Sequence, residues 1–274
     1  MEIERRMWEA LAGAPVLMLG GANVIMQLAK LPVGRGVAES KVESGRVDRH
    51  PVKRARTTLA YLAIAMFGTE EERAAYRREV NRSHRDVRSG PSAEVAYDAF
   101  NPDLQLWVAA CIYVGAEQAL QLTSPGTLEA GDGIAEAVYR HGARFGTTLQ
   151  VPEDMWPVDR ERFEEYWNEG VGRIEMDDVT RSYLSDFASL RFLPAPLARV
   201  LGPGHGFIAA GYLPAPFRDE LGLRWSPRRQ RFHDRVTKLV IRASRLTPGP
   251  IRRFPLNFYL WDTRRRIRDG TPIV

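Results

Sequence analysis

The stretch FGTEEE, residues 67–72, decides how the chain around it folds. Thr69 followed by Glu72 has the spacing of a capping box, in which the two residues satisfy each other's backbone N–H groups at the start of a helix. Residues 52–67 and 70–88, on either side, both repeat apolar side chains at helical spacing. Because the reversal between them is so short, we expect the two helices to run antiparallel as a hairpin.

This hairpin brings one histidine close to cationic residues. One stripe on the apolar face of the second helix consists of Tyr76, Val80, His84 and Val87. The imidazole is therefore expected to face inward, while the neighbouring arginines point away. Counting from the centre of the turn places His84 level with Lys53. Arg56 and Thr57 lie three or four residues nearer the turn, about 4.5–6 Å away along the axis, so both should be neighbours of His84.

The first helix of the hairpin is expected to leave room beside this histidine. Its inward stripe is predicted to be Arg56, Ala60, Ala63 and Phe67. A histidine, a cation and small side chains between two helices suit a flat anionic cofactor, and haem fits that description. Neutral imidazole binds iron, and cations bind the propionates. The alternative is a hydrogen-bonded core histidine beside arginines that form a solvated face or an ordinary helix start.

The remaining sequence indicates one all-α domain spanning residues 1–274. Proline and glycine separate segments of helical periodicity, and Asn101 and Ser226 mark helix starts with a proline in the first turn. No internal repeat or long polar linker divides the chain. The predicted helices cover residues 2–11, 17–31, 52–67, 70–88, 102–122, 128–145, 159–173, 177–190 and 227–246.

Positive charge is concentrated towards the C-terminal end of the sequence. The section 224–270 holds fourteen arginines and lysines against three aspartates, a net +11 in a chain whose total is +5. Aromatic residues are interleaved with these cations, a composition that suits an anionic membrane surface. No nucleic-acid-binding motif accompanies the charge, so nucleic acid is not an expected partner. The aromatic residues are Trp225, Phe232, Phe254, Phe258 and Trp261.

Several other chemistries are disfavoured by missing motifs. A single cysteine, Cys111, rules out an internal disulfide and a zinc site of paired cysteines, and its apolar surroundings predict a buried side chain. Glu-x-x-His, His-Glu-x-x-His, the phosphate-binding loop and the Gly-x-Ser-x-Gly elbow are all absent. GPGHG, residues 202–206, is predicted to be a turn. His141 is predicted to end a helix and to bond to solvent or a carbonyl.

The uncharged stretch Ala10–Ala29 allows two interpretations. It is about long enough to span a bilayer. Gly13, Pro15 and Gly20 interrupt it, however, and favour a buried, closely packed helix pair. The mixed charges of MEIERRMWEA do not form a secretory signal, so the expected location is the bacterial cytoplasm, with peripheral contact to a membrane as an addition.

The order of motifs resembles the latex-clearing rubber oxygenase and MpaB-type oxygenase family over about residues 11–268. The motifs are GG, QLA followed by PVGRGV, RARTT, VNRSHRDVRSG, YDAFNPDLQLWV, AVYRHGARFGTTLQVPEDMWP, FEEYW and LGLRWSPRRQRFHDRV. The resemblance implies an all-helical domain with a partly globin-like core and non-covalent b-type haem. It further implies an oxygenase that uses dioxygen to oxidise an apolar, isoprenoid-like substrate or cleave its C=C bond.

The resemblance also implies roles for individual residues. The family's His-x-x-Val motif is HRDV here, so His84 is the expected iron ligand. Its Arg-x-x-Arg/Lys-Thr motif falls on Lys53, Arg56 and Thr57, which would line the opposite face of the cofactor. Arg56 would supply positive charge near dioxygen, Thr57 a hydrogen bond, and Lys53 a contact with a propionate or the distal pocket.

This chain departs from the family pattern at several positions. Glu39 and Ser40 stand where the family commonly has a histidine after GV, Ala109 stands at another such position, and Lys53 replaces an arginine. Two other functions therefore stay open: a non-catalytic helical module that binds membranes through its basic section, and a peroxidase-like or sensor haem protein.

Overall fold

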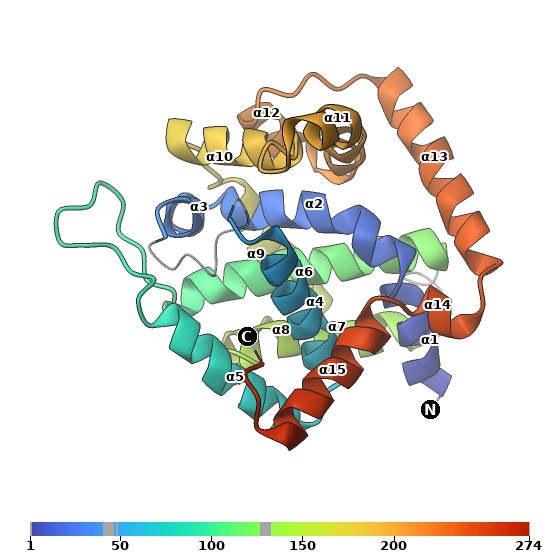
Figure 1. The fold of residues 1–274 in the computed structure, drawn as a ribbon. Coiled ribbons are helices and arrows are strands. Elements are labelled where there is room, and N and C mark those ends of the chain that lie inside the picture. Colours follow the sequence, from blue (N-terminus) through green and yellow to red (C-terminus); the bar gives the residue numbers. More distant parts are fainter. Residues whose placement is uncertain (1, 41–46, 48, 127–132, 274) are drawn as a thin grey trace.

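The computed structural model describes residues 2–40, 47, 49–126 and 133–273, and this part of the chain is all-α (Figure 1). Its only β pairing is an isolated antiparallel bridge between Arg88 and Asp98. The prediction of an all-α fold is confirmed. The helices are α1 (Glu2–Leu11), α2 (Ala14–Leu28), α3 (Leu31–Ala38), α4 (Pro51–Phe67), α5 (Glu70–His84), α6 (Pro102–Thr123), α7 (Ile134–Gly142), α8 (Arg144–Thr147), η2 (Glu153–Met155), α9 (Arg160–Val171), α10 (Asp178–Ala188), α11 (Ala195–Tyr212), α12 (Ala215–Glu220), α13 (Pro227–Arg245), α14 (Gly249–Arg252) and α15 (Leu256–Asp269).

Helix α6 runs through the middle of the main core. It packs against α1, α2, α7 and α8, and α2 in turn lies between α6 and α11 (Figure 1). The fully buried side chains of α6 include Trp107, Cys111 and Tyr113. Burial raises the pKa of the Cys111 thiol well above its ordinary value. The predicted burial of Cys111 is therefore confirmed.

The chain bends sharply between α2 and α3, with an angle of 106° between the two helices. Pro32 lies in the first turn of α3, and Gly34 lets α3 approach its neighbours closely. A Cβ on Gly34 would lie 2.5 Å from the backbone oxygen of Leu28 and 2.5 Å from Cγ2 of Thr180. Among the described residues no single helix has the length and hydropathy to cross a membrane, and only the bent pair of α2 and α3 meets both requirements together.

The predicted hairpin is present, and its caps form as expected. Thr69 Oγ1 accepts from the Glu72 backbone N–H at 3.3 Å, and the Thr69 N–H donates to the Glu72 carboxylate at 2.9 Å. Asn101 and Ser226 likewise cap α6 and α13. Helix α5 ends at His84, four residues earlier than predicted, because the chain beyond it turns back: Ala99 N–H donates to the Val87 carbonyl at 2.9 Å.

Some elements differ from the sequence predictions. Helices α3, α11, α12, α14 and α15 were not predicted, and part of the predicted helix 128–145 lies outside the described residues. The predicted turn at GPGHG is wrong, because these residues lie inside α11. Gly202 permits close packing there, since a Cβ would lie 2.3 Å from the Ser189 carbonyl oxygen of the neighbouring segment.

Helix α15 crosses α4 and forms a second, smaller core (Figure 1). This core joins Ala60 and Ala63 of α4 to Tyr76 of α5 and to Leu256 and Leu260 of α15. The small residues of α4 therefore contact α15 instead of leaving an open space. The face of α4 that meets the interior cavity is a different one.

Candidate functional site

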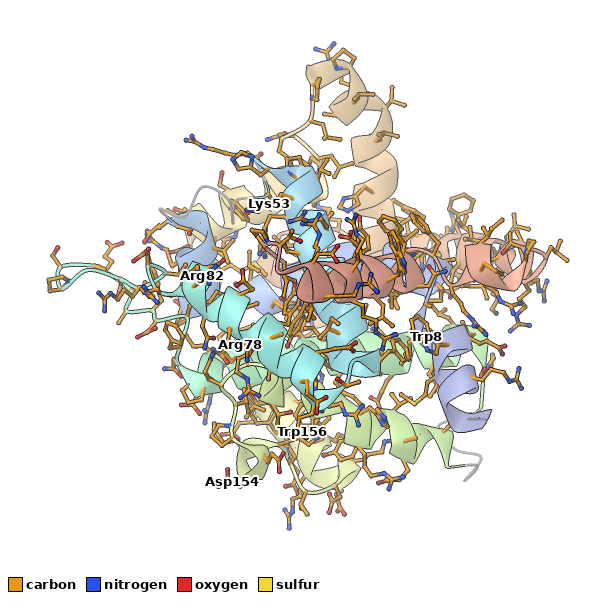
Figure 2. All side chains as sticks on the ribbon, turned by 60° about the horizontal axis from the view of Figure 1, so that its bottom comes forward. Trp8, Lys53, Arg78, Arg82, Asp154 and Trp156 are labelled. Carbon is orange, nitrogen blue, oxygen red and sulfur yellow. The ribbon has the colours of Figure 1, made fainter. Side chains whose placement is uncertain are left out.

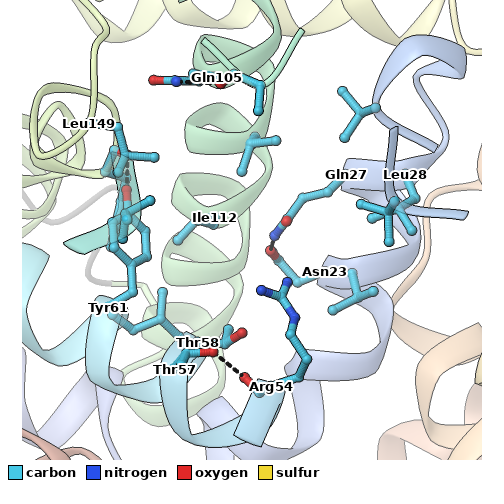
Figure 3. A pocket seen from close by; sticks show the side chains of 18 of the residues that line it. Asn23, Gln27, Leu28, Arg54, Thr57, Thr58, Tyr61, Gln105, Ile112 and Leu149 are labelled. Carbon is cyan, nitrogen blue, oxygen red and sulfur yellow. Dashed lines mark hydrogen bonds between the residues drawn. The ribbon is translucent and has the colours of Figure 1, made fainter. Parts of the chain in front are cut away.

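A cavity of about 380 Å³ lies among α2, α3, α4, α5 and α6 (Figure 3). Its volume is within the range of about 300–1,000 Å³ that is common for small-molecule sites. Aliphatic side chains form most of the wall, including Val24, Val33, Leu62, Val108 and Ile112. Such a wall suits an apolar ligand, and the few polar side chains would fix its orientation.

His84, the last residue of α5, faces this cavity. Tyr76, Val80 and Val87 line it as well, so the inward orientation predicted for this stripe is confirmed. The rings of His84 and Phe100 are nearly perpendicular, with centroids 6.4 Å apart. Burial, with a smaller contribution from the charge of Arg54, lowers the pKa of His84 to about 4. The ring is therefore neutral at pH 7 and can act as a metal ligand.

The hydrogen bonding of His84 differs from that of three other histidines. His141 Nδ1 donates to the Ala137 carbonyl at 2.8 Å, His205 Nδ1 to Ala188 at 3.0 Å, and His233 Nε2 to Ile208 at 3.2 Å. The carbonyl partner predicted for His141 is thus confirmed. His84 Nδ1 is buried without a hydrogen-bond partner among the described residues. A buried ring nitrogen without a partner is costly unless a ligand satisfies it.

Two cations from the start of α4 line the cavity, Lys53 and Arg54. No described residue bonds to the guanidinium of Arg54, and burial lowers its pKa from the usual value. It stays protonated near neutral pH, as arginine does in proteins. Asp98 is the only carboxylate among the described cavity residues, and it accepts a bond from the Phe100 N–H at 2.8 Å. The cavity therefore carries excess positive charge and favours anionic groups.

Arg56, the arginine singled out from the sequence, does not line the cavity. It belongs to the same stripe as Ala60 and Ala63, which pack against α5 and α15. Its Nε is buried and has no hydrogen-bond partner in the described chain. The prediction that this stripe faces the space beside His84 is wrong, because α15 covers it. Arg54, two positions earlier, provides the cation expected there.

Thr57 does line the cavity and is 7% exposed. Its hydroxyl donates to the Arg54 carbonyl at 3.1 Å, and its own carbonyl accepts from the Tyr76 hydroxyl at 2.6 Å. The neighbouring Thr58 also faces the cavity, and no described residue bonds its hydroxyl (Figure 3). Thr58 can thus donate to a ligand without breaking a bond within the protein, whereas Thr57 cannot.

Asn23 and Gln27 add a polar patch to the cavity that was not predicted from the sequence. Gln27 Nε2 donates to Asn23 Oδ1 at 2.7 Å, and Asn23 Nδ2 donates to the Cys111 carbonyl at 2.6 Å. Figure 3 shows the Arg54 side chain extending towards this pair. The sequence does carry a signal for this patch: two amide side chains, one helical turn apart, in a helix that is otherwise apolar.

Other charged residues of α5 lie away from the cavity, as predicted. Arg78 and Arg82 extend from the exposed face of the helix, and Arg82 pairs with Glu79 at 3.2 Å (Figure 2). Of the positions that depart from the family pattern, Ser40 lines the cavity, whereas Glu39 forms an ion pair with Arg35. Ala109 is fully buried in the main core.

A porphyrin would need one imidazole for its iron and open space beside small side chains, and the cavity offers both. The described residues contain no group of three or more metal-ligating side chains, whereas haem iron needs only one histidine from this cavity. A Cβ on Gly20 would meet no atom within 4 Å, and small side chains of α6 also line the space. These are Gly115, Ala116 and Ala119.

Comparisons with known proteins identify relatives over most of the chain. A family model described as "ER-bound oxygenase mpaB/B'/Rubber oxygenase, catalytic domain" matches residues 8–243. An uncharacterized protein of Mycobacterium bovis and another of Mycobacterium tuberculosis are each 48% identical to this chain over 261 residues. Each alignment covers 94% of this chain and 100% of the relative. No solved structure matches the chain.

Proposed function

Because the chain belongs to the family of MpaB and rubber oxygenase catalytic domains, we propose that it is a haem b-dependent oxygenase acting on an apolar, isoprenoid-like substrate. The observation that carries this proposal is the neutral, unpartnered imidazole of His84 facing an apolar cavity. The family match supports an oxygenase role. The dependence on haem and the class of substrate are our inference from the cavity.

The chain supplies an axial ligand and positive charge. One ring nitrogen of His84 would bind iron, and bound haem would supply the activation of dioxygen. Lys53 would bind the carboxylates of the cofactor. Arg54 would hold a fixed positive charge where negative charge develops during oxygen reduction, in a site lined mainly by apolar side chains. These roles follow from which cations line the cavity.

The polar side chains around Arg54 would position reactants. Thr58 has a hydroxyl available to donate, and the amide pair of Asn23 and Gln27 borders the same space. The aliphatic wall would hold a hydrocarbon chain by burying its surface. Because this interaction is non-directional, it would not select for one chain length. The long aliphatic wall favours oxidation or C=C cleavage of an extended apolar molecule, while the cations would hold the anionic groups of the cofactor.

The test compares haem binding by the wild type and His84→Ala, with His141→Ala as the control. His141 already bonds to a carbonyl at the end of its helix, so its replacement removes an imidazole without touching the cavity. After supplementation with haem, we expect a stoichiometric Soret band for the wild type and His141→Ala, and loss or a large shift of that band for His84→Ala. An identical spectrum in all three proteins would contradict the assignment.

Oxygen consumption tests the reaction separately. The haem-loaded wild type should consume dioxygen when an isoprenoid is added and should yield carbonyl products. Full haem binding through His84 without any oxidation of isoprenoids would overturn the oxygenase assignment. That result would leave the peroxidase-like or sensor alternative in its place.

A further inference from the structure

The helices α13, α14 and α15, which follow one another at the C-terminal end of the chain (Figure 1), carry large apolar side chains that are exposed to solvent. Three aromatic rings near the start of α15 form a contiguous cluster: Phe254 and Phe258 have centroids 6.3 Å apart, and Phe258 and Trp261 have centroids 5.9 Å apart. These rings are 53%, 45% and 56% exposed, respectively. Further exposed apolar residues on this C-terminal surface are Phe232, Leu239, Leu246 and Ile251.

Cations accompany these apolar residues. Arg231, Arg235, Lys238 and Arg242 recur at helical spacing on the exposed face of α13, and no described residue pairs with any of them. Two aspartates of residues 224–270 already have partners on their own helices. Asp234 accepts a bond from Gln230 at 2.8 Å, and Asp262 pairs with Arg265 and Arg266. The uncompensated charge of this surface is therefore strongly positive.

We propose that this C-terminal surface, formed by the exposed apolar and cationic residues of α13, α14 and α15, docks on an anionic lipid bilayer. Exposed phenylalanine and tryptophan favour the boundary between headgroups and acyl chains, and arginine favours anionic headgroups. All three rings of the aromatic cluster lie outside the part of the chain that matches the oxygenase family, because that match ends at residue 243. Charge complementarity selects the anionic bilayer over a neutral partner.

The proposal is also connected to the cavity. Leu256 lies between Phe254 and Phe258 in the sequence, yet it is 2% exposed and lines the cavity that contains His84. The segment that carries the aromatic cluster of the C-terminal surface therefore also forms part of the cavity wall. If the proposed function holds, an apolar substrate dissolved in the bilayer would reach the molecule beside this wall. Docking itself requires neither haem nor substrate.

The experiment measures co-sedimentation of the full chain with vesicles of phosphatidylcholine alone and of phosphatidylcholine mixed with phosphatidylglycerol. We expect binding to the mixed vesicles, with an affinity that falls as salt is raised. Phe258→Ser/Trp261→Ser should bind roughly tenfold more weakly or worse, because it removes two aromatic side chains from the boundary. Val158→Ser/Val179→Ser, which alters exposed apolar residues elsewhere, is the matched control and should bind like the wild type.

Two further measurements separate the contribution of the cations to membrane binding from that of the inserted aromatic rings. Arg235→Gln/Arg242→Gln should lower the affinity for mixed vesicles by about fivefold for each cation removed. Trp261 is the one exposed tryptophan of the six, so its emission should shift to the blue on binding. Trp261→Phe should keep the binding and lose most of that shift.

Three outcomes would overturn the proposal. They are a lack of binding to anionic vesicles, equal binding by Phe258→Ser/Trp261→Ser and the wild type, and a dimer that forms through the aromatic cluster and excludes vesicles. Analytical ultracentrifugation of the same variants detects the third outcome. Circular dichroism of each variant confirms that its helices are intact.

Discussion

At the scale of single residues, His84 is held neutral by its surroundings. Burial is the larger cause of its lowered pKa, and the charge of Arg54 is the smaller one. A ring that does not accept a proton at moderate acidity keeps a lone pair available for a metal over a wide pH range.

The same pKa shift makes the stability of the apoprotein depend on pH. The unfolded chain binds a proton at His84 below about pH 6.5, whereas the folded chain does so only near its pKa of about 4. The stability that neutral His84 contributes is therefore complete above the unfolded pKa. It is lost as the pH falls from about 6.5 towards about 4. When the pH is lowered from 7 to 5, we expect the free energy of unfolding to fall less in His84→Gln than in the wild type. The difference between the two decreases should be as much as about 2 kcal/mol.

Urea unfolding of the haem-free proteins at the two pH values measures this difference. His50→Gln alters an exposed ring and serves as the control, with the pH dependence of the wild type. Equal pH dependence in His84→Gln and the wild type would show that His84 is solvated and not buried against the cavity.

The two arginines of RART are expected to behave differently. Arg54 lines the cavity and Arg56 does not. We expect Arg54→Met to lower the rate of oxygen uptake roughly hundredfold in haem-loaded protein, since it removes a preorganised positive charge. Arg56→Met should stay within a few-fold of the wild type. In the haem-free protein, NMR titration should show the pKa of His84 raised by Arg54→Met; an unchanged value would contradict the contact.

The sequence was informative about His84 but not about which arginine accompanies it. The inward direction of His84 follows from an apolar stripe on its own helix. The direction of Arg56 depends on which neighbour covers each face of α4, and successive helical residues are turned by about 100° from one another. Without knowledge of α15, the stripe of small residues was assigned to the cavity instead of to a helix contact.

At the scale of elements, α15 supports the helix that carries the cations of the site. Leu260 of α15 is 6% exposed and packs in the second core, whereas Phe258 on the same helix is 45% exposed. We expect Leu260→Ala to lower the free energy of unfolding by about 2–5 kcal/mol. Phe258→Ala should cost about 1 kcal/mol or less. Chemical denaturation measures both, and equal losses would contradict the packing of α15 on α4.

Capped helices were the elements most readily predicted from sequence. Thr69, Asn101 and Ser226 each satisfy backbone N–H groups locally, so their signal does not depend on the rest of the molecule. Helix α11 was missed because GPGHG carries residues that usually break helices. Gly202 and Gly206 instead allow close packing against the segment around Ala188 and Ser189, a tertiary cause that local patterns do not contain.

At the scale of the whole molecule, a ligand that binds only the folded chain should raise its thermal stability. We expect the melting temperature to rise with haem concentration in the wild type and in His141→Ala, by about 2–4 °C for each kcal/mol of binding free energy gained. His84→Ala should show little change. Differential scanning calorimetry measures the shift, and an equal rise in His84→Ala would place haem elsewhere on the protein.

The all-α class followed from the sequence, because helical periodicity extends over most of the chain. The way the helices surround the cavity did not, since it depends on the 106° bend between α2 and α3 and on the return of α15 across α4. The partial likeness to a globin core stays a prediction.

The single thiol of Cys111 lies at zero exposure in the central helix. An alkylating reagent can reach it only when the core opens, so the rate of modification reports how often the folded protein opens. In the native state, a second cysteine introduced at an exposed position would then react alone. The natural sequence thus accepts a spectroscopic label at any chosen surface site without first removing a cysteine.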